Sequence, residues 1–469
     1  MQRNSRAYPA IAGLSSALLW GCSSLTFQPP VDSSVVTSPA SWESADGCND
    51  GRISQGWVDT FHDAELERTV DAAMAHNQDL AAAAARMRSA RYVRLAGRSR
   101  VLPQASLLTS GNLSRSENGR ARSSSSESYG LTVSSSWEAD LWGRLRDLNA
   151  ADDADYLATR ALFRGARLSL AAATARAWCN LIAAEQQLQL ATVTLDSFQR
   201  NLRISERNYK GTGQGALDVQ FGRTNVASAR RDLESRRLAR DEAARALEVL
   251  TGAYPSGKTR AGHELPELKR RVPAGLPSEL LERRPDLAAA RAGILATARR
   301  ADAARKSLLP SLGLSTSAGT PVSAFNKLLN PDYLVASIGA NIAQTLYSGG
   351  ALGNQARAAL EQNQASVHDY HQAALTAFRE VESALDADHS LGEQERYLVT
   401  EVEQAALAEK QATRDYADGI EGSDILDVLE AQRRANNARS SLIRLRNERL
   451  LNRIDLHLAL GGDFRTRES

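Results

Sequence analysis

Proline is scarce and unevenly placed in this sequence of 469 residues. The chain has 13 prolines, and none lies in residues 104–254 or 332–469. Because proline removes a helix hydrogen bond and clashes with the preceding turn, these two runs have room for very long helices. Net charge is also small, since 57 Lys and Arg against 55 Asp and Glu give +2. This balance excludes the broad basic surface that binds nucleic acid, so we expect no nucleic-acid partner.

Long apolar runs are missing except near the N-terminus. Residues 10–20 are mainly apolar, follow two arginines and end in Leu19-Trp20-Gly21-Cys22. This pattern is typical of an export signal, and the apolar stretch is too short for a permanent membrane helix. It resembles the lipobox of bacterial lipoproteins, in which cleavage leaves an acylated cysteine as the first residue. We therefore predict a signal peptide at residues 1–21 and lipidation of Cys22.

Trp20 stands where a lipobox usually has a small residue, so a plain secretory leader with an incidental cysteine stays open as an alternative. Loss of the leader would remove Arg3 and Arg6 and leave 55 charges of each sign, which is 57 minus 2 against 55. Beyond Cys22, no uninterrupted apolar run approaches the roughly 20 residues that a membrane helix needs. Any membrane crossing must therefore use strands.

Cysteine is nearly absent from the rest of the chain, where Cys48 and Cys179 are the two that follow Cys22. An oxidising compartment would permit a disulfide, but the spacing does not support one, so whether they pair stays open. Residues 22–56 are rich in serine, proline, aspartate and glycine and have no periodicity. This composition predicts an extended tether behind the lipid anchor.

The two halves of the remaining chain repeat each other. Asp-Leu-Ala-Ala occurs at residues 79 and 286, and Leu-Pro at 102 and 309, both at an offset of 207. Further matches keep the offset between 205 and 209. A tandem duplication is the simplest explanation. We predict repeat 1 at residues 57–254, a proline-rich junction at 255–284, repeat 2 at 285–464 and a C-terminal tail at 465–469.

Each repeat is predicted to contain a helix that stops at the Leu-Pro pair, two strands and then long helices. The strands are expected at about 105–114, 128–137, 311–319 and 333–343, with loops at 116–127 and 320–332. Along the last strand, apolar residues at every second position from Leu334 to Ile342 alternate with Ser337, Gly339 and Asn341. A transmembrane strand needs this two-residue period, although a soluble amphipathic strand would show it too.

The long helices show seven-residue spacing. Leucines recur from Leu181 to Leu202 in the first repeat, and Leu360, Val367, Ala374 and Val381 follow the same spacing in the second. This pattern indicates closely packed coiled-coil contacts. A helix from about 145 to 209 would measure ~98 Å and would need partners along its whole length. Glycines at 211–215 and 419–422 mark the points where such helices turn back.

Three stretches resemble motifs of a known protein family. Residues 275–287 (GLPSELLERRPDL), 137–144 (WEADLWGR) and 426–432 (LDVLEAQ) closely resemble outer-membrane factors of the TolC/OprM type, particularly the NodT-like lipoprotein branch of the outer membrane efflux proteins. The resemblance extends from about Trp57 to Phe464. It implies an α+β membrane protein that forms a homotrimer. Each protomer would add four strands to a twelve-stranded transmembrane β-barrel, which a long periplasmic α-helical coiled-coil barrel continues.

The resemblance also implies a function. Such proteins are passive exit ducts of tripartite systems, in which a periplasmic adaptor joins the duct to an inner-membrane transporter, here expected to be of the RND type. We expect a lipid-anchored protein of the bacterial outer membrane that conducts drugs or other toxic small molecules. No catalytic residue, cofactor or metal is expected, and the substrate is not identified. A duct for type I protein secretion and a lipid-anchored periplasmic coiled-coil scaffold stay open as alternatives.

Motif matching places a candidate periplasmic gate at Asp218, Asp427 and Glu430, with helix-tip contacts at Tyr416 and Gly419. Three-fold symmetry would bring like charges together, which favours cation binding or opening of the aperture. Alternatively, the carboxylates stabilise early helical turns through the helix dipole. The interval from Tyr416 to Asp427 is eleven positions, whereas the matching interval in the first repeat is nine. This difference indicates a two-residue insertion near Gly422.

Two further patterns suggest chemistry. Residues 252–259 (GAYPSGKT) satisfy the phosphate-loop expression. A phosphate loop needs a preceding strand and a following helix, and neither is predicted here, so we interpret the match as coincidence. His368 and His371 lie three apart on a predicted helix. Without a third ligand, a solvated helix face is the expected explanation.

Overall fold

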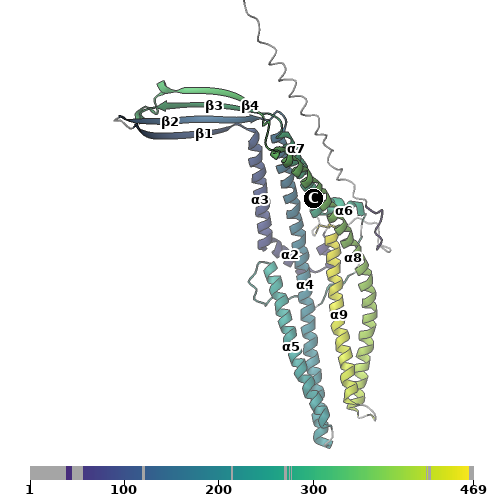
Figure 1. Ribbon diagram of the computed structural model, residues 1–469. Coiled ribbons are helices and arrows are strands. Elements are labelled where there is room, and N and C mark those ends of the chain that lie inside the picture. Colours follow the sequence, from purple (N-terminus) through teal and green to yellow (C-terminus); the bar gives the residue numbers. More distant parts are fainter. Residues whose placement is uncertain are drawn as a thin grey trace, which may run out of the picture.

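The structure is a computed structural model that describes residues 38–44, 56–118, 122–212, 215–262, 264–268, 272–273, 275, 277–418, 420 and 424–463. A four-stranded sheet lies at one end, and long helices extend away from it (Figure 1). The predicted signal peptide and C-terminal tail, Cys22, Cys48 and Gly419 fall outside the described residues. None of the helices that the structure describes is long and apolar enough to cross a membrane.

The same order of elements occurs in both halves of the chain. The first half contains η1 (Trp57–Phe61), α2 (Ala64–His76), α3 (Gln78–Arg98), η2 (Ser99–Val101), β1 (Gln104–Asn118), β2 (Arg122–Ala139), α4 (Arg144–Thr212) and α5 (Ala216–Leu250). The second contains α6 (Pro277–Arg283), α7 (Pro285–Lys306), β3 (Ser311–Val322), η3 (Phe325–Lys327), η4 (Pro331–Tyr333), β4 (Val335–Ala343), α8 (Ala351–Ala417) and α9 (Ile425–Ala459). Helix, two strands and two long helices thus follow one another twice.

The four strands form one antiparallel sheet in the order β1-β2-β3-β4. Its register places Ser106, Ser134, Ser317 and Ser337 in one row across the sheet. Hydroxyls pair within this row at 2.9 Å between Ser106 and Ser134 and at 2.8 Å between Ser317 and Ser337. The next row contains Leu107, Val133, Ala318 and Ala336. One face of the sheet is therefore hydroxyl-rich and the other apolar.

The loops between strands are shorter than predicted. We expected a loop at 116–127, but β1 continues to Asn118, β2 begins at Arg122, and these two residues pair. The prediction treated a serine- and arginine-rich segment as a turn. An antiparallel ladder is held by backbone hydrogen bonds and can expose polar side chains to water, so composition did not end these strands. Likewise, β3 enters the loop expected at 320–332, and the connection that remains before β4 contains the short helices η3 and η4.

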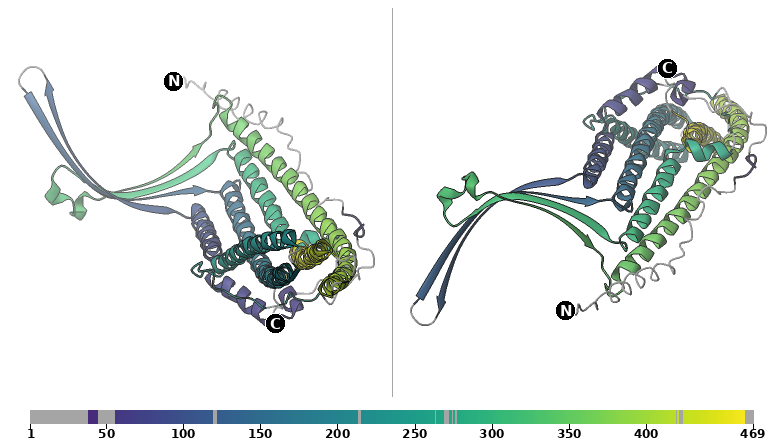
Figure 2. Two further views of the ribbon diagram at one scale, coloured as in Figure 1. Left: turned by 90° about the horizontal axis from the view of Figure 1, so that it is seen from below. Right: turned by 90° about the horizontal axis from the view of Figure 1, so that it is seen from above.

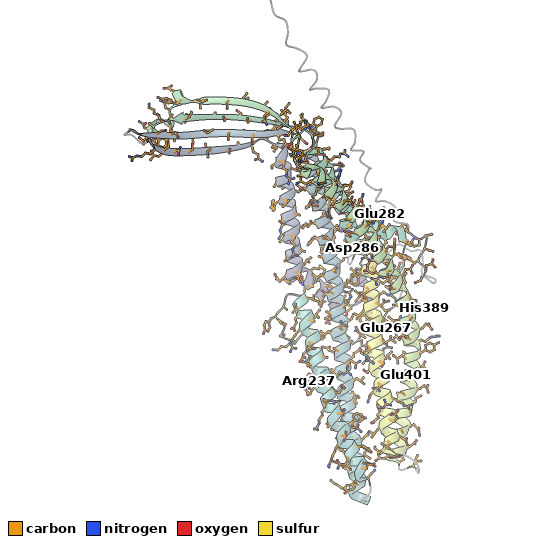
Figure 3. All side chains as sticks on the ribbon, viewed as in Figure 1. Arg237, Glu267, Glu282, Asp286, His389 and Glu401 are labelled. Atoms are coloured by element: carbon orange, nitrogen blue, oxygen red, sulfur yellow. The ribbon has the colours of Figure 1, made fainter. Side chains whose placement is uncertain are left out.

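Helices α4 and α8 have 69 and 67 residues, which is about 100 Å each. Near the sheet, α3, α4, α7 and α8 lie side by side in that order (Figure 2). Farther away, α4 pairs with α5 and α8 with α9. Charged side chains such as Arg237 and Glu401 cover these hairpins (Figure 3).

The heptads bury their residues unequally. In α8, Val367, Ala374 and Val381 are buried as predicted. In α4, Leu181 is fully buried, whereas the leucines that follow it at seven-residue spacing are half-buried. The protomer therefore packs the α8 seam internally and leaves part of the α4 seam open.

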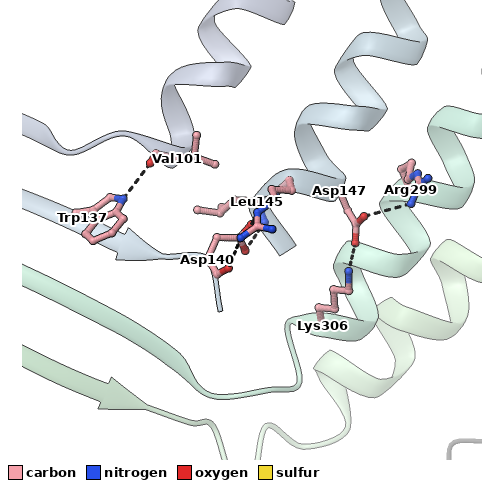
Figure 4. Close-up of polar contacts among 8 residues, drawn as sticks. Val101, Trp137, Asp140, Leu145, Asp147, Arg299 and Lys306 are labelled. Atoms are coloured by element: carbon pink, nitrogen blue, oxygen red, sulfur yellow. Dashed lines mark hydrogen bonds and ion pairs between the residues drawn. The ribbon is translucent and has the colours of Figure 1, made fainter. Parts of the chain in front are cut away.

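The strand-to-helix motif at 137–144 fastens the sheet to the helices (Figure 4). The indole of Trp137 donates to the carbonyl of Val101 at 2.9 Å, and that of Trp142 to the carbonyl of Pro310 at 2.7 Å. Asp140 accepts from the first amides of α4, at 3.0 Å from Leu145. One indole contacts the chain just before β1 and the other the chain just before β3. The motif is therefore held on both sides, which sets the direction in which the helices leave the sheet.

The junction motif at 275–287 fastens the start of α7 to the helices that follow it. Arg284 precedes Pro285, the first residue of α7, and its guanidinium is largely buried. It donates to Glu380 of α8 at 2.6 Å, to Asp286 at 2.7 Å and to the carbonyl of Ala459 in α9 at 3.3 Å. One side chain therefore joins the start of α7 to both helices of the second hairpin.

Candidate functional site

The candidate site lies at the hairpin ends farthest from the sheet, where α4 turns into α5 and α8 into α9 (Figure 1). Asp218 is the third residue of α5, and Asp427 is the third residue of α9. The motif match therefore selected equivalent positions of the two hairpins. Both carboxylates lie in a first helical turn, where backbone amides and the helix dipole favour negative charge.

The two helix starts are capped differently. Gly215 precedes α5 with φ of 88° and provides no side-chain cap. Asp424 precedes α9, and its carboxylate accepts from the amide of Leu426 at 3.3 Å. Asp427 in turn accepts from the amide of Asp424 at 3.4 Å, which completes a capping box. Within one protomer, Asp427 thus stabilises the start of α9 while its side chain stays exposed.

The structure adds Asp424 to the site. Burial, and after it the charge of Asp424, raises the pKa of Asp218. Charges of the two hairpins therefore act on each other across the gap between α5 and α9. Sequence reasoning missed Asp424, although an aspartate three residues before Asp427 and just ahead of a helix is the ordinary signal of a capping position.

Glu430 differs from the other two candidates. Its carboxylate accepts from Arg433 at 2.8 Å and from Arg434 at 2.7 Å, both on its own helix. Hydrogen bonds from Arg433 and then Arg434 lower the pKa of Glu430 to about 2. Its charge is offset by two neighbouring cations. This pairing weakens the prediction that Glu430 contributes to an acidic constriction.

The connections at the two ends differ in length. α5 follows α4 after residues 213–215, whereas α9 follows α8 after residues 418–424. α4 continues three residues past Tyr209, but α8 ends one residue past the half-buried Tyr416. The connection between α8 and α9 is therefore longer for two reasons. It contains the two extra residues, and α8 ends two residues earlier than α4 does relative to the matching tyrosine. Of the two expected tip contacts, Tyr416 lies in the last turn of α8, and Gly419 lies outside the described residues.

A buried polar link holds the hairpins together next to these ends. Gln432 is the last residue of the LDVLEAQ motif. Its side-chain oxygen accepts from the amide of Asn201 at 2.9 Å, and its side-chain nitrogen donates to the hydroxyl of Ser197 at 3.1 Å. Gln432 and Asn201 are both buried. An unpaired amide at such a site would be costly, so the link favours one register of α9 against α4. Sequence reasoning did not select Gln432.

The phosphate-loop pattern at 252–259 has another use. It follows a helix, α5, and the described chain after it has no helix before α6. The carboxylate of Glu248 accepts from the amides of Gly257, Lys258 and Thr259 at 2.7, 3.0 and 3.0 Å. The hydroxyls of Thr259 and Ser256 also donate to it, at 2.8 and 3.1 Å. The loop therefore encloses a side chain of its own chain.

Among the described residues, the histidine and cysteine candidates gain no metal site and no disulfide. His368 lies on an exposed face of α8, and His371 is half-buried. No group of three metal-ligating side chains occurs in the part of the chain that the structure describes. Cys179 is a free, buried thiol, and burial together with Asp63 raises its pKa to about 12. This thiol is poorly suited to ionise or react.

Comparison with known proteins gives consistent matches. A relative from Pseudomonas putida, the pyoverdine export outer membrane protein OpmQ, is 29% identical over 459 residues, which is 96% of each chain. The cation efflux system protein CusC of Escherichia coli is 30% identical over 422 residues, 88% of this chain and 90% of CusC. The solved outer-membrane channel OprN has the same fold, with a TM-score of 0.83, 24% identity, and coverage of 94% of this chain and 99% of OprN.

A sequence model of the outer membrane efflux protein family matches the chain twice, at residues 69–253 and 276–462. Each match covers one of the two halves that have the same order of elements. Crystal structures of CusC likewise align over 91% of this chain and 99% of CusC, at 25% identity and a TM-score of 0.79. The protein therefore belongs to the outer membrane efflux protein family, whose members are channels of the bacterial outer membrane that extend into the periplasm.

Proposed function

We propose that this protein is the exit duct of a tripartite efflux system and conducts small toxic molecules passively across the outer membrane. A periplasmic adaptor and an inner-membrane transporter of the RND type would complete the system. Relatives described as proteins of pyoverdine export, cation efflux and solvent efflux support a small solute over a secreted protein. The observation that argues against a coiled-coil scaffold is the sheet with two open edges on top of the helices.

The open edges support a trimeric barrel. Among the residues that the structure describes, β1 and β4 each pair with a strand on one side only. In lipid an unpaired edge costs several kcal/mol per backbone group, so the sheet must close with other copies. Three copies of four strands would give an even-numbered, twelve-stranded barrel. The hydroxyl-rich face would line the pathway and the apolar face would contact lipid. On this proposal residues 57–254 and 285–464 are the two repeats, joined by 255–284.

The two outer helices of the row next to the sheet, α3 and α8, also have faces that could meet in neighbouring copies. Away from α4, helix α3 presents an exposed stripe of Ala81, Ala85, Arg88, Tyr92 and Leu95. Away from α7, helix α8 presents an exposed stripe of Ala358, Glu361, Ala365, His368 and Leu375. Arg88 is ten residues from the end of α3, and Glu361 is ten residues from the start of α8. Both therefore lie about 15 Å from the sheet.

Charge reversal tests this assembly. Among the described residues neither Arg88 nor Glu361 has an ion-pair partner in its own protomer. We expect Arg88→Glu to lower the temperature of trimer dissociation by about 2 °C, because it sets like charges against each other. Glu361→Arg should have the same effect, and the double variant should recover most of the loss. The temperature of trimer dissociation is measured by heat-modifiable migration in gels. Additive losses in the double variant would show that these stripes do not meet.

Conductance tests the function itself. We expect the purified protein to form channels in planar lipid bilayers, and deletion of its gene to sensitise cells to a subset of a panel of toxic compounds. A protein that lacks conductance and becomes a soluble elongated species without its acyl chains would contradict the duct and favour the scaffold.

The gate is proposed at the hairpin ends, with Asp427 as its main acid and Asp218 beside it. Exposure of Asp427 and the interaction of Asp218 with Asp424 support this assignment. Glu430 is retained with a smaller role because Arg433 and Arg434 offset its charge. We also propose acylation at Cys22, in keeping with the outer-membrane location of the family.

A further inference from the structure

Part of the predicted N-terminal tether, around Trp42, packs against the helices. Trp42 is 5% exposed and belongs to the core cluster that includes Val272, Leu280 and Phe378. Its ring meets that of Phe378 of α8 edge-on, with centroids 6.1 Å apart. Its indole nitrogen donates to the carbonyl of Gly275 at 3.1 Å. The tryptophan therefore contacts both the inter-repeat junction and α8.

The two residues after Trp42 are held by backbone contacts. The amides of Glu43 and Ser44 donate to the two carboxylate oxygens of Glu382, each at 2.9 Å. Glu382 lies one helical turn beyond Phe378 on α8. A carboxylate that accepts two successive amides sets the direction of the chain as well as its position. Burial of the indole and this paired contact together exclude a freely moving segment at residues 42–44.

The contact lies at a defined distance along α8 from the sheet. Phe378 is 27 residues from Ala351, where α8 begins beside the sheet, so it lies about 40 Å from that end. Trp42 is 20 residues from Cys22, and 20 residues span at most about 66–72 Å. A lipid anchor on the sheet side is therefore within reach, with about eight residues to spare.

We propose that residues 42–44 form a clasp that moors the lipidated N-terminus to α8 and the inter-repeat junction, so that the chain from Cys22 to Trp42 acts as a tether of limited length between bilayer and helices. This inference rests on the proposed lipidation of Cys22. Any force that the lipid anchor exerts on the tether acts on the clasp. Because the clasp includes the inter-repeat junction, the force is transmitted to both halves of the chain.

Shortening the tether tests the clasp. Deleting four residues within 24–37 leaves ample reach, whereas deleting twelve leaves eight residues, at most about 29 Å, which is less than the distance to be spanned. We expect the four-residue deletion to be silent. The twelve-residue deletion should lower the dissociation midpoint of the trimer in outer-membrane vesicles by at least about 5 °C, because it pulls Trp42 from its site. Replacing the same residues with a Gly-Ser segment of equal length should have no effect.

Combined variants separate the clasp from general damage. Trp42→Ala, or the milder Glu382→Gln, releases the segment and should itself lower the midpoint. In either background the twelve-residue deletion should then cause no further loss, and Cys22→Ser should abolish its effect as well. An additive loss, or a silent twelve-residue deletion in the acylated protein, would overturn the inference, as would absence of acyl label on the wild-type protein. Conductance of the same preparations reports on the duct independently.

Discussion

Replacing Glu248 with alanine is expected to destabilise the protein by about 3 kcal/mol, because three amides and two hydroxyls would lose their shared acceptor. Glu248 is 4% exposed, and its carboxylate is the centre of the loop that ends repeat 1. Thermal or denaturant unfolding of the detergent-solubilised protein measures the loss.

A matched control is available six residues earlier, or nearly two helical turns. Glu242 lies exposed on the same helix, so Glu242→Ala should change the stability by no more than about 0.5 kcal/mol. Glu248→Gln keeps the size of the side chain but supplies one oxygen where the loop uses two, so it should lie between the two. Equal stability of the Glu248→Ala and Glu242→Ala proteins would contradict a structural role for the loop.

The same site predicts a dependence on pH. Burial acts to raise the pKa of Glu248, but hydrogen bonds from Gly257, Thr259 and Ser256 outweigh it and lower the pKa from 4.5 to about 2. The unfolded chain therefore binds the proton more readily than the folded protein does. The stabilisation is complete above about pH 4.5 and is lost as the pH falls towards 2. We expect Glu248→Gln to reduce the acid sensitivity of unfolding in this window.

Removing the charge of Asp427 is expected to raise single-channel conductance roughly twofold or more and to weaken block by divalent cations. Three symmetry-related carboxylates at the aperture would hold a cation that obstructs the pathway. Asp427 also caps α9, because it accepts from the amide of Asp424. Asp427→Asn keeps an oxygen for the cap and removes the charge, so it should reproduce the effect of Asp427→Ala. Planar-bilayer recordings at graded calcium concentrations measure both quantities.

Other acids at the hairpin ends serve as controls. Glu430→Gln should change conductance less than either Asp427 variant, because Arg433 and Arg434 already offset the charge of Glu430. If Asp427→Ala alters the channel but Asp427→Asn does not, the cap and not the charge controls the aperture. Unchanged conductance in both Asp427 variants would refute the gate assignment.

Much of the fold was predictable because it follows from local patterns. Two-residue alternation indicated β4, which the structure has at Val335–Ala343. Proline-free heptads indicated α8, where Val367, Ala374 and Val381 are buried. The extent of the β1–β2 hairpin was not predictable from composition, because its pairing depends on backbone bonds with a partner strand.

Parts of the candidate site were within reach of sequence reasoning and parts were not. The spacing of Glu430 from Arg433 and Arg434 is three and four residues, which predicts ion pairs on one helix face. The influence of Asp424 on Asp218 joins residues 206 positions apart. Local spacing cannot predict this interaction, because it depends on how α5 and α9 each pack against α4.

The sequence by itself determined the elements of this protein: its tandem order, its long helices, its strands and its family. These follow from periodicity and from proline and glycine placement, which act on the backbone within a few residues. Only the tertiary structure decided which groups meet, such as Glu248 with a loop that resembles a phosphate site and Trp42 with Phe378. Contact energies fall steeply with distance. Which distant residues come within that range is decided by the packing of the whole chain.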